Sequence, residues 1–295
     1  MNSSSRARLG LVSAMTIFGT IGLFVRAIPL SSGEIALFRA LAALVLLAGY
    51  MLITKKRISF KDAKKESLLL FISGAAMGFN WILLFEAYKY TSVSIATLAY
   101  YFAPVIVTVV CPLLFKEKMG AKQWICFGMS TLGIFLLTGI GSFSSDARNL
   151  IGILFGLGAA ILYASVVLLN KYIKRTENVQ RTFMQFIAAA AVLIPYVFLT
   201  GGTKILSLDS KGWIALAIVG IVHTGICYCI YFSSIKNLSG QQTAILSYID
   251  PLVAVLLSVF ILKEQITFWQ IIGGALILGF TLWNELSSKK DIKNR

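Results

Sequence analysis

The chain has 295 residues, of which 58% are hydrophobic and 13% are charged, and its formal net charge is +15. A soluble domain carries about 25% charged residues, so this sequence cannot cover a water-facing surface and predicts an integral membrane protein. The positive charge does not indicate a nucleic-acid partner, because the Lys and Arg residues lie in short gaps between apolar runs, where they orient a membrane protein.

Ten apolar segments follow one another along the chain, each close to the 20 or so residues that a membrane helix requires. Their predicted bounds are 9–28, 33–53, 67–88, 94–115, 123–141, 150–170, 181–200, 212–232, 242–262 and 268–286. The first segment follows a basic start, as in a signal peptide, but it is long for one and lacks a convincing cleavage site, so we interpret it as an uncleaved span. All ten are predicted to be helices, because an open strand would leave backbone groups unpaired in lipid.

The basic residues predict how these segments are oriented. Of the 27 Lys and Arg residues, 20 fall in one set of alternate gaps and six in the other, and Arg39 lies inside a span. Because cytoplasmic loops carry the excess of Lys and Arg, both termini are predicted to face the cytoplasm.

Part of the sequence occurs twice. Residues 89–119 and 236–266 match at a constant offset of 147, and both run from a polar start through a mid-segment proline to a Lys-Glu pair. The matched pairs are Lys89 and Lys236, Ser92 and Ser239, Tyr101 and Tyr248, Pro104 and Pro251, Lys116 and Lys263, and Glu117 and Glu264.

An odd number of spans in each half makes the two copies enter the membrane from opposite sides. The predicted fold class is therefore an all-α integral membrane protein of ten transmembrane helices in two inverted five-helix repeats. The repeats are 1–141 and 150–286, and a basic cytoplasmic tail, 287–295, follows. Such repeats are typical of secondary transporters, which place the substrate site near the midplane between the repeats.

Ionisable residues inside a span are costly and are candidates for function. Arg39 and Glu86 lie at similar predicted depth and have opposite charges. One interpretation is a buried ion pair that locks the second and third spans together, with Glu34 as a competing partner. The other is that Arg39 meets an anionic group, or that the pair breaks and forms as the outer gate moves.

His223 and Asp250 are both predicted near mid-depth, in the eighth and ninth spans. Together they could carry a proton coupled to transport, because histidine titrates near neutrality and a buried carboxylate has a raised pKa unless it is paired. The alternative is a hydrogen bond between adjacent helices. Asp250 precedes Pro251, where a kink leaves carbonyl groups unpaired, and this favours a functional role for Asp250.

Pro104 and Pro251 are candidate hinges, since each removes one backbone hydrogen bond within a predicted helix. A static kink that aids packing is the alternative. Tyr100, Tyr101 and Tyr248 lie within a turn of these prolines, where aromatic faces can stack an apolar substrate or hold a cation, or simply pack.

Asn80 and Gln185 are uncharged polar residues within spans, and each is either a substrate contact or a hydrogen bond between helices. The Gly-x3-Gly spacings at 74–78 and 152–156 predict close approach of helix backbones. The sequence contains no GxxxxGK[ST] phosphate loop, no HExxH and no GxSxG. We therefore expect no cofactor, no metal and no catalytic residue.

These features resemble the drug/metabolite transporter superfamily, EamA type, over nearly the whole chain. The resemblance is carried by Phe38-Arg39-Ala40, by the segment 87–92, and by Pro104 and Pro251, each followed by an apolar run to Lys-Glu. It implies a ten-helix inverted-repeat carrier of amino acids, nucleotide sugars, drugs or other metabolites. It also implies a cavity lined by spans one to four and six to nine.

Many carriers of this superfamily are exporters, so the resemblance also implies export. The family commonly has uncharged residues where this chain has Glu86 and Asp250, and this departure suggests a cationic or zwitterionic substrate, or proton coupling. We hypothesise a secondary active exporter of a small organic metabolite, such as an amino acid or amine, in the plasma membrane.

Several alternatives remain open from the sequence. An uptake carrier or facilitator would share these features, and proton coupling and a homodimer are both compatible with them. A lipid-modifying membrane enzyme would need a nucleophile, a base and metal ligands at one interface, whereas the polar residues here are scattered. The expected partners are the substrate and the bilayer, and a bacterial inner membrane suits the length and the bare termini.

Overall fold

The computed structural model describes residues 3–54, 60–115, 120–137, 147–176, 178–235, 237–238 and 240–293. All regular elements within these ranges are helical. The first Lys-Glu pair of the repeat, 116–117, and the end of the fifth predicted segment, 138–141, lie outside the described residues.

Helices lie in each of the predicted apolar segments, and two short helices occur between them. In chain order the elements are α1 (Ser3–Gly19), α2 (Ile21–Arg26), α3 (Ser32–Ile53), α4 (Phe60–Lys65), α5 (Ser67–Tyr90), α6 (Val93–Tyr100), α7 (Ala103–Phe115), α8 (Ala121–Leu137), α9 (Ala147–Tyr172), α10 (Asn178–Leu199), the 3-10 helix η1 (Ile205–Ser207), α11 (Ser210–Ala217), the π-helix η2 (Ile218–Ile226), α12 (Cys227–Ile235), α13 (Gly240–Ser247), α14 (Ile249–Phe260) and α15 (Phe268–Lys293).

Seven helical segments among the described residues are long and apolar enough to cross a membrane. They are Ser5–Arg26, Ser32–Ile53, Ser67–Tyr90, Val93–Val110, Ala147–Tyr172, Val179–Leu199 and Ser210–Ile235. Three shorter apolar helices, Ala121–Leu137, Ile249–Phe260 and Phe268–Trp283, accompany them.

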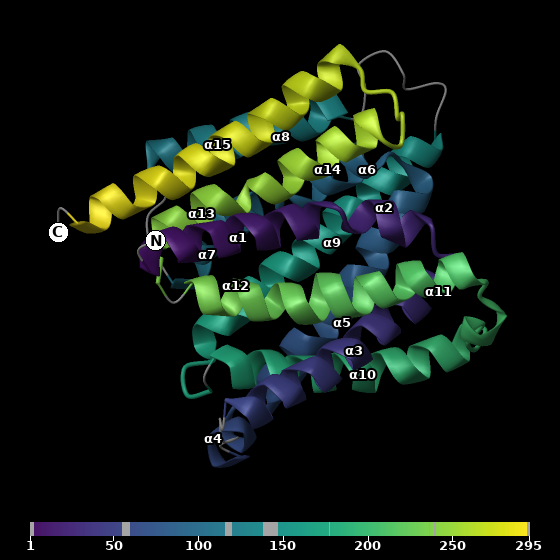
Figure 1. Cartoon of the computed structure of the whole chain (residues 1–295). Coiled ribbons are helices and arrows are strands. Elements are labelled where there is room, and N and C mark those ends of the chain that lie inside the picture. Colours follow the sequence, from purple (N-terminus) through teal and green to yellow (C-terminus); the bar gives the residue numbers. More distant parts are fainter. Residues whose placement is uncertain are drawn as a thin grey trace.

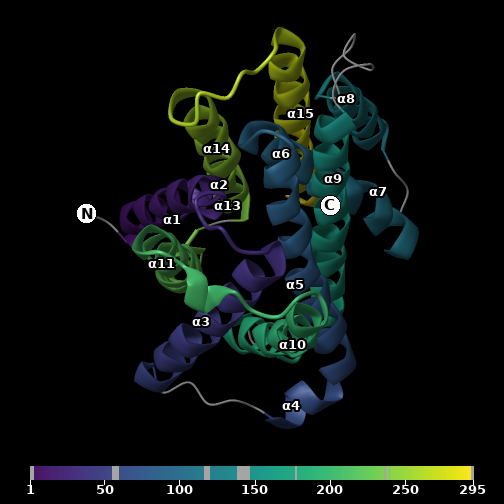
Figure 2. The same ribbon diagram turned by 90° about the vertical axis from the view of Figure 1, so that its right-hand side faces the viewer.

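The helices form one elongated bundle. The start of α1 and the end of α15 lie at the same end, which we call the terminal end, whereas α2 and α11 lie at the opposite, distal end (Figure 1). Figure 2 shows α8 and α15 on one side of the bundle and α3 and α10 on the other. Because α8 and α15 pack mainly against each other, they contribute little to the centre, as the resemblance implied for spans five and ten.

Two of the predicted close approaches between helices depend on glycine. A methyl group at Gly74 of α5 would collide with the carbonyl oxygen of Gln185 on α10. A methyl group at Gly152 of α9 would lie 2.6 Å from the Thr91 side chain. Small residues at these positions therefore let neighbouring helices pack at short range.

Three helical segments are broken in the middle. The α1–α2 break is at Thr20, the α6–α7 break follows Tyr100, and the α13–α14 break is at Tyr248. Helices α6 and α13 are related by the sequence offset of 147, so two of the breaks fall at matching positions. Pro104 and Pro251 lie in the first turns of α7 and α14, where a missing N–H leaves no helical bond unmade.

The eighth predicted segment is not a continuous α-helix. Residues Ile218–Ile226 form the π-helix η2 between α11 and α12, and the Thr224 hydroxyl donates to the carbonyl oxygen of Val219 at 2.9 Å. The π-helix is rare and occurs frequently at functional sites. The apolar pattern of the sequence gave no sign of it.

A carboxylate ties two elements together at the terminal end. Glu66, just before α5, accepts hydrogen bonds from the backbone N–H groups of residues 174–176 and from the Thr176 hydroxyl. Burial by itself raises the pKa of Glu66, but these hydrogen bonds to the charged form outweigh it and hold the pKa below its usual value. The junction thus joins the start of α5 to the connection between α9 and α10.

Candidate functional site

Polar side chains from both halves of the chain meet in the interior. Among the hydrogen bonds that join residues before 140 to residues after 150, three involve an ionisable residue of a predicted span together with a hydroxyl group: Arg39 with Thr224, Thr20 with His223, and Tyr101 with Asp250. We call these six residues the central polar cluster. Each of the three contacts joins an ionisable residue of an apolar helix to a hydroxyl group of the other half of the chain.

Arg39 lies on α3, and only 5% of its surface is exposed. Its Nε donates to the Thr224 hydroxyl at 2.9 Å. The guanidinium also lies 4.5 Å from the centre of the Trp81 ring and 5.9 Å from that of Phe85, distances that suit a cation–π contact. No carboxylate of the described residues forms an ion pair with it.

His223 lies on η2 and is buried. Its Nε2 is 2.7 Å from the Thr20 hydroxyl, and its Nδ1 is 3.2 Å from the carbonyl oxygen of Ile218. The Thr20 hydroxyl is also 2.8 Å from the carbonyl oxygen of Ile17, to which it donates. The α1–α2 break therefore places a hydroxyl against the only histidine of the chain.

Asp250, near the start of α14, accepts a hydrogen bond of 2.8 Å from the Tyr101 hydroxyl. The Tyr101 ring also packs against Tyr248 and Tyr100, and the Tyr100 ring contacts Tyr163 of α9. Asp250 is not fully buried. The α6–α7 and α13–α14 breaks thus bring a carboxylate among aromatic rings.

The α1–α2 break connects these contacts. A methyl group at Gly19 would lie 2.6 Å from the carbonyl oxygen of Asp250, so α1 approaches the α14 backbone at the residue before Thr20. Thr20 contacts His223, which is followed by Thr224, the partner of Arg39. The chain at the α1–α2 break therefore lies between the Arg39–Thr224 pair and the Tyr101–Asp250 pair.

The predicted ion pairs do not form. Glu86 pairs with Lys89 of the same helix at 2.9 Å and not with Arg39. Glu34 accepts from its neighbour Ser31 and from the backbone of Lys204. The reason is geometric: counting residues gives depth along a helix, but the direction in which a side chain points depends on how the helices pack.

His223 and Asp250 also lack the direct contact that the sequence suggested, because each bonds a hydroxyl group of the other half of the chain. Asn80 donates to the carbonyl oxygen of Ala159 at 2.6 Å. Gln185 bonds Ser73 and, at 2.8 Å, Asn170. The described contacts of Asn80 and Gln185 thus join helices and do not include the central polar cluster.

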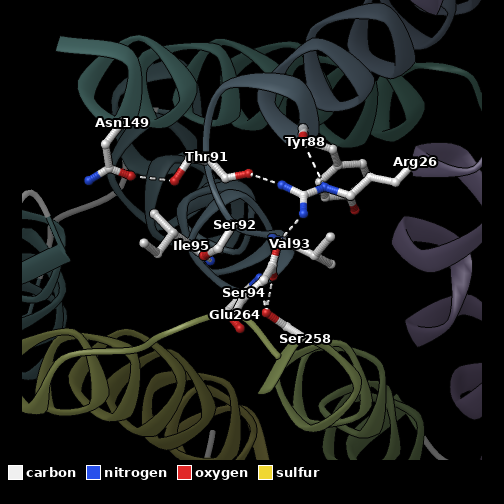
Figure 3. Close-up of polar contacts among 10 residues, drawn as sticks. All are labelled: Arg26, Tyr88, Thr91, Ser92, Val93, Ser94, Ile95, Asn149, Ser258 and Glu264. Atoms are coloured by element: carbon white, nitrogen blue, oxygen red, sulfur yellow. Dashed lines mark hydrogen bonds and ion pairs between the residues drawn. The ribbon is translucent and has the colours of Figure 1, made fainter. Parts of the chain in front are cut away.

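A second polar network lies at the distal end (Figure 3). Arg26, the last residue of α2, donates from Nε to the carbonyl oxygen of Tyr88 at 2.8 Å and from Nη2 to that of Thr91 at 2.6 Å. Its Nη1 forms an ion pair with Glu264. We call the Arg26–Glu264 pair the distal latch.

Glu264 also holds the start of α6. Its carboxylate accepts from the backbone N–H of Val93 at 2.9 Å and from the Ser258 hydroxyl. Ser258 in turn accepts from the backbone N–H of Ser94 at 3.3 Å. The distal latch therefore ties α2, the α5–α6 turn and the end of α14 together, joining both halves of the chain.

A pocket of about 440 Å³ lies beside the latch. Apolar residues, together with Arg26, Tyr88 and Lys89, line it. Phe85, another lining residue, also packs on the Arg39 guanidinium. Phe85 is thus a neighbour of both the pocket and the central polar cluster.

The sequence indicated some of these residues and missed others. Glu264 belongs to the repeated Lys-Glu motif, and Arg26 is the one charge that interrupts the first apolar run, so both carried a signal. Thr20 and Thr224 were missed as partners, because a threonine in an apolar run has no distinguishing pattern. Within the described residues, no group of three His, Cys, Asp or Glu side chains is arranged to hold a metal ion.

The chain is similar to known transporters over almost its whole length. It is 31% identical to the uncharacterized transporter YxxF of Bacillus subtilis (strain 168) over 274 residues, covering 92% of this chain and 87% of that protein. It is 26% identical to an uncharacterized transporter of Archaeoglobus fulgidus over 281 residues, covering 93% and 95%. A solved crystal structure shares the fold, with a TM-score of 0.63 and 18% identity over 97% of this chain and 98% of that one.

The sequence profile of the EamA-like transporter family matches twice, at residues 6–139 and 150–284. The two matches together span nearly all of the helical bundle. The chain is therefore a multi-pass membrane transporter, not an enzyme, and belongs to the EamA-like transporter family.

Proposed function

We propose that this protein is a secondary active transporter that moves a small organic metabolite, such as an amino acid or amine, by alternating access. In this proposal ten helices cross the bacterial cytoplasmic membrane as two inverted repeats, 1–141 and 150–286, with both termini in the cytoplasm. The matching positions of α6 and α13 in the two halves support the repeat.

The observation that carries the proposal is that the three side-chain pairs of the central polar cluster each join one half of the chain to the other. Alternating access requires a site whose two walls belong to elements that move relative to each other, and inverted-repeat carriers place it at the repeat interface. The pairs Arg39–Thr224, Thr20–His223 and Tyr101–Asp250 meet this requirement.

The distal latch supports export as the direction. With the termini in the cytoplasm, the distal end faces outward, and the Arg26–Glu264 pair closes it. A carrier whose outer end is closed can take up its substrate only from the cytoplasmic side. Opening the outer end then requires the latch to break.

We further propose that Asp250 is the proton-coupling group. A carboxylate in the interior is costly, and Asp250 has one hydroxyl partner, Tyr101, and partial exposure. Protonation would neutralise it as the central polar cluster moves between the two sides. His223, held between Thr20 and a carbonyl oxygen, is less free to take part.

The test is transport by the purified protein in liposomes loaded with candidate metabolites, with an imposed pH gradient. Asp250→Asn should abolish the response to the gradient while leaving the protein folded. Glu86→Gln is the matched control, because Glu86 pairs with Lys89 of its own helix away from the cluster. Failure of every amino acid and amine to move in either direction would refute the proposed substrate class, and an unchanged gradient response in Asp250→Asn would refute the coupling role.

A further inference from the structure

Arg39 is a buried cation without an anion. Among the described residues its guanidinium bonds only the neutral Thr224 hydroxyl, and the ring of Trp81 covers one face. A buried charge is costly unless it is paired and hydrogen-bonded. The arrangement therefore lacks a negatively charged partner.

The free part of the guanidinium has a defined shape. Nε is occupied by Thr224, whereas Nη1 and Nη2 have no hydrogen-bond acceptor among the residues that the structure describes. These two nitrogens form the end of a planar fork, which matches the two oxygens of a carboxylate. Lysine would supply the charge but not this fork.

One neighbour of Arg39 also lines the pocket at the distal end. Phe85 lies 5.9 Å from the guanidinium, measured to its ring centre, and also lines the 440 Å³ pocket beside the distal latch. Phe85 is therefore a neighbour of both Arg39 and the pocket at the distal end.

The charges of the central polar cluster further limit which kind of molecule can bind there. Arg39 is its one permanent cation, and Asp250, which bonds Tyr101, is its one carboxylate. A phosphate group, which carries nearly two negative charges at pH 7, would find a single cation beside a carboxylate. A molecule with one carboxylate, and an ammonium group for Asp250, balances both sites.

Resting on the transporter function proposed above, we propose that the transported molecule carries a carboxylate, which binds the terminal nitrogens of Arg39. The substrate is then an amino acid or a related organic acid with an apolar or aromatic body, and not a simple amine. Arg39 acts as the residue that selects for the acid group.

The experiment compares molecules that differ only in the carboxylate. Liposomes containing the full-length protein are given a mixture of the proteinogenic α-amino acids and the amines that correspond to them without the carboxyl group, such as phenylalanine with phenethylamine and leucine with isoamylamine. Mass spectrometry of the trapped contents identifies which members moved. The same measurement is made on Arg39→Lys and Arg39→Gln, and thermal unfolding of each variant in detergent establishes that it is folded.

We expect wild-type protein to move one or more amino acids and to prefer each over its amine by roughly tenfold or more, the effect of one strong charged contact. Arg39→Lys should lose most of this preference, because it keeps the charge but not the fork. A variant that fails to fold is replaced by Thr224→Val, which frees Nε and should weaken the preference without removing the cation.

Two outcomes overturn the inference. If amines move as fast as their amino acids, or if Arg39→Lys keeps the wild-type preference in a folded protein, Arg39 does not bind a carboxylate, while the transporter function stands. If no member of the mixture moves, the inference and the proposed amino acid or amine substrate fall together. These results are distinct, so the two proposals are tested separately.

Discussion

The distal latch allows a prediction of how strongly the distal end of the bundle is held closed. We consider the variant Glu264→Gln, which keeps one oxygen acceptor but removes the negative charge. In the wild type Glu264 accepts from Arg26, from the backbone of Val93 and from Ser258. Arg26 retains its bonds to the carbonyl oxygens of residues 88 and 91 in the variant, so the closed state is weakened and not abolished.

The exposure of the pair sets the magnitude. The Arg26 side chain is 32% exposed and that of Glu264 is 12% exposed. Fully exposed pairs contribute about 0.2–1 kcal/mol, and breaking a buried pair costs about 3–5 kcal/mol. For this partly exposed pair we take about 1.5 kcal/mol, which changes an equilibrium constant roughly tenfold.

The assay measures access to a buried position at the distal end. Leu30 lines the distal pocket and is 6% exposed. A cysteine is placed there by Leu30→Cys, in a protein whose four native cysteines have been replaced. A membrane-impermeant maleimide is then added to vesicles with the distal end outside. When closing is faster than labelling, the labelling rate follows the open population, so Glu264→Gln should raise it about tenfold.

Glu86→Gln provides the control at the same end of the bundle. It removes an ion pair of 2.9 Å to Lys89 that lies within one helix, and it should leave the labelling rate unchanged. The reasoning is refuted if Glu264→Gln labels at the wild-type rate, or if both variants accelerate labelling equally.

Two further predictions concern stability. Because the pKa of Glu66 in the folded protein lies below its unfolded value, its contribution is present above the unfolded pKa of about 4.3 and is lost as the pH falls through the folded pKa. The melting temperature of the detergent-solubilised protein should therefore decrease when the pH is lowered below about 5, and Glu66→Gln should make this decrease smaller. If the melting temperatures of the variant and the wild type decrease in parallel with pH, Glu66 is not the cause. Gly74→Ala should destabilise the protein by about 1–3 kcal/mol, because the added methyl group meets the backbone of Gln185. Gly49→Ala, where nothing lies within 4 Å, should have little effect on the same melting measurement, and equal losses in both would contradict the packing argument.

The positions of the helices could be predicted because apolar length and basic gaps are local properties of the sequence. The repeat also aligned the α6–α7 and α13–α14 breaks, since both follow one pattern of residues. The break at Thr20 and the π-helix η2 could not be predicted in this way. Both depend on which backbone groups bond each other, and the apolar composition on either side is unchanged.

The ionisable residues of the central polar cluster could be predicted from the sequence, but their hydrogen-bond partners could not. Arg39, His223 and Asp250 stood out because ionisable residues are rare in apolar runs. Their partners are neutral hydroxyl groups, on Thr224, Thr20 and Tyr101, which no local pattern distinguishes. The rotation of each helix about its own axis decides such pairings, and that rotation follows from packing over the whole bundle.

The π-helix η2 has a consequence for how this protein can change over evolution. A π-helical bond spans one residue more than an α-helical bond, so the segment accommodates extra length between two ordinary helices. Loss of one residue there would turn η2 into an ordinary α-helix between α11 and α12, and Thr224, which lies inside η2, would change its position relative to Arg39. In this protein a single-residue insertion or deletion within η2 would thus change the contacts of the central polar cluster while leaving the flanking helices in place.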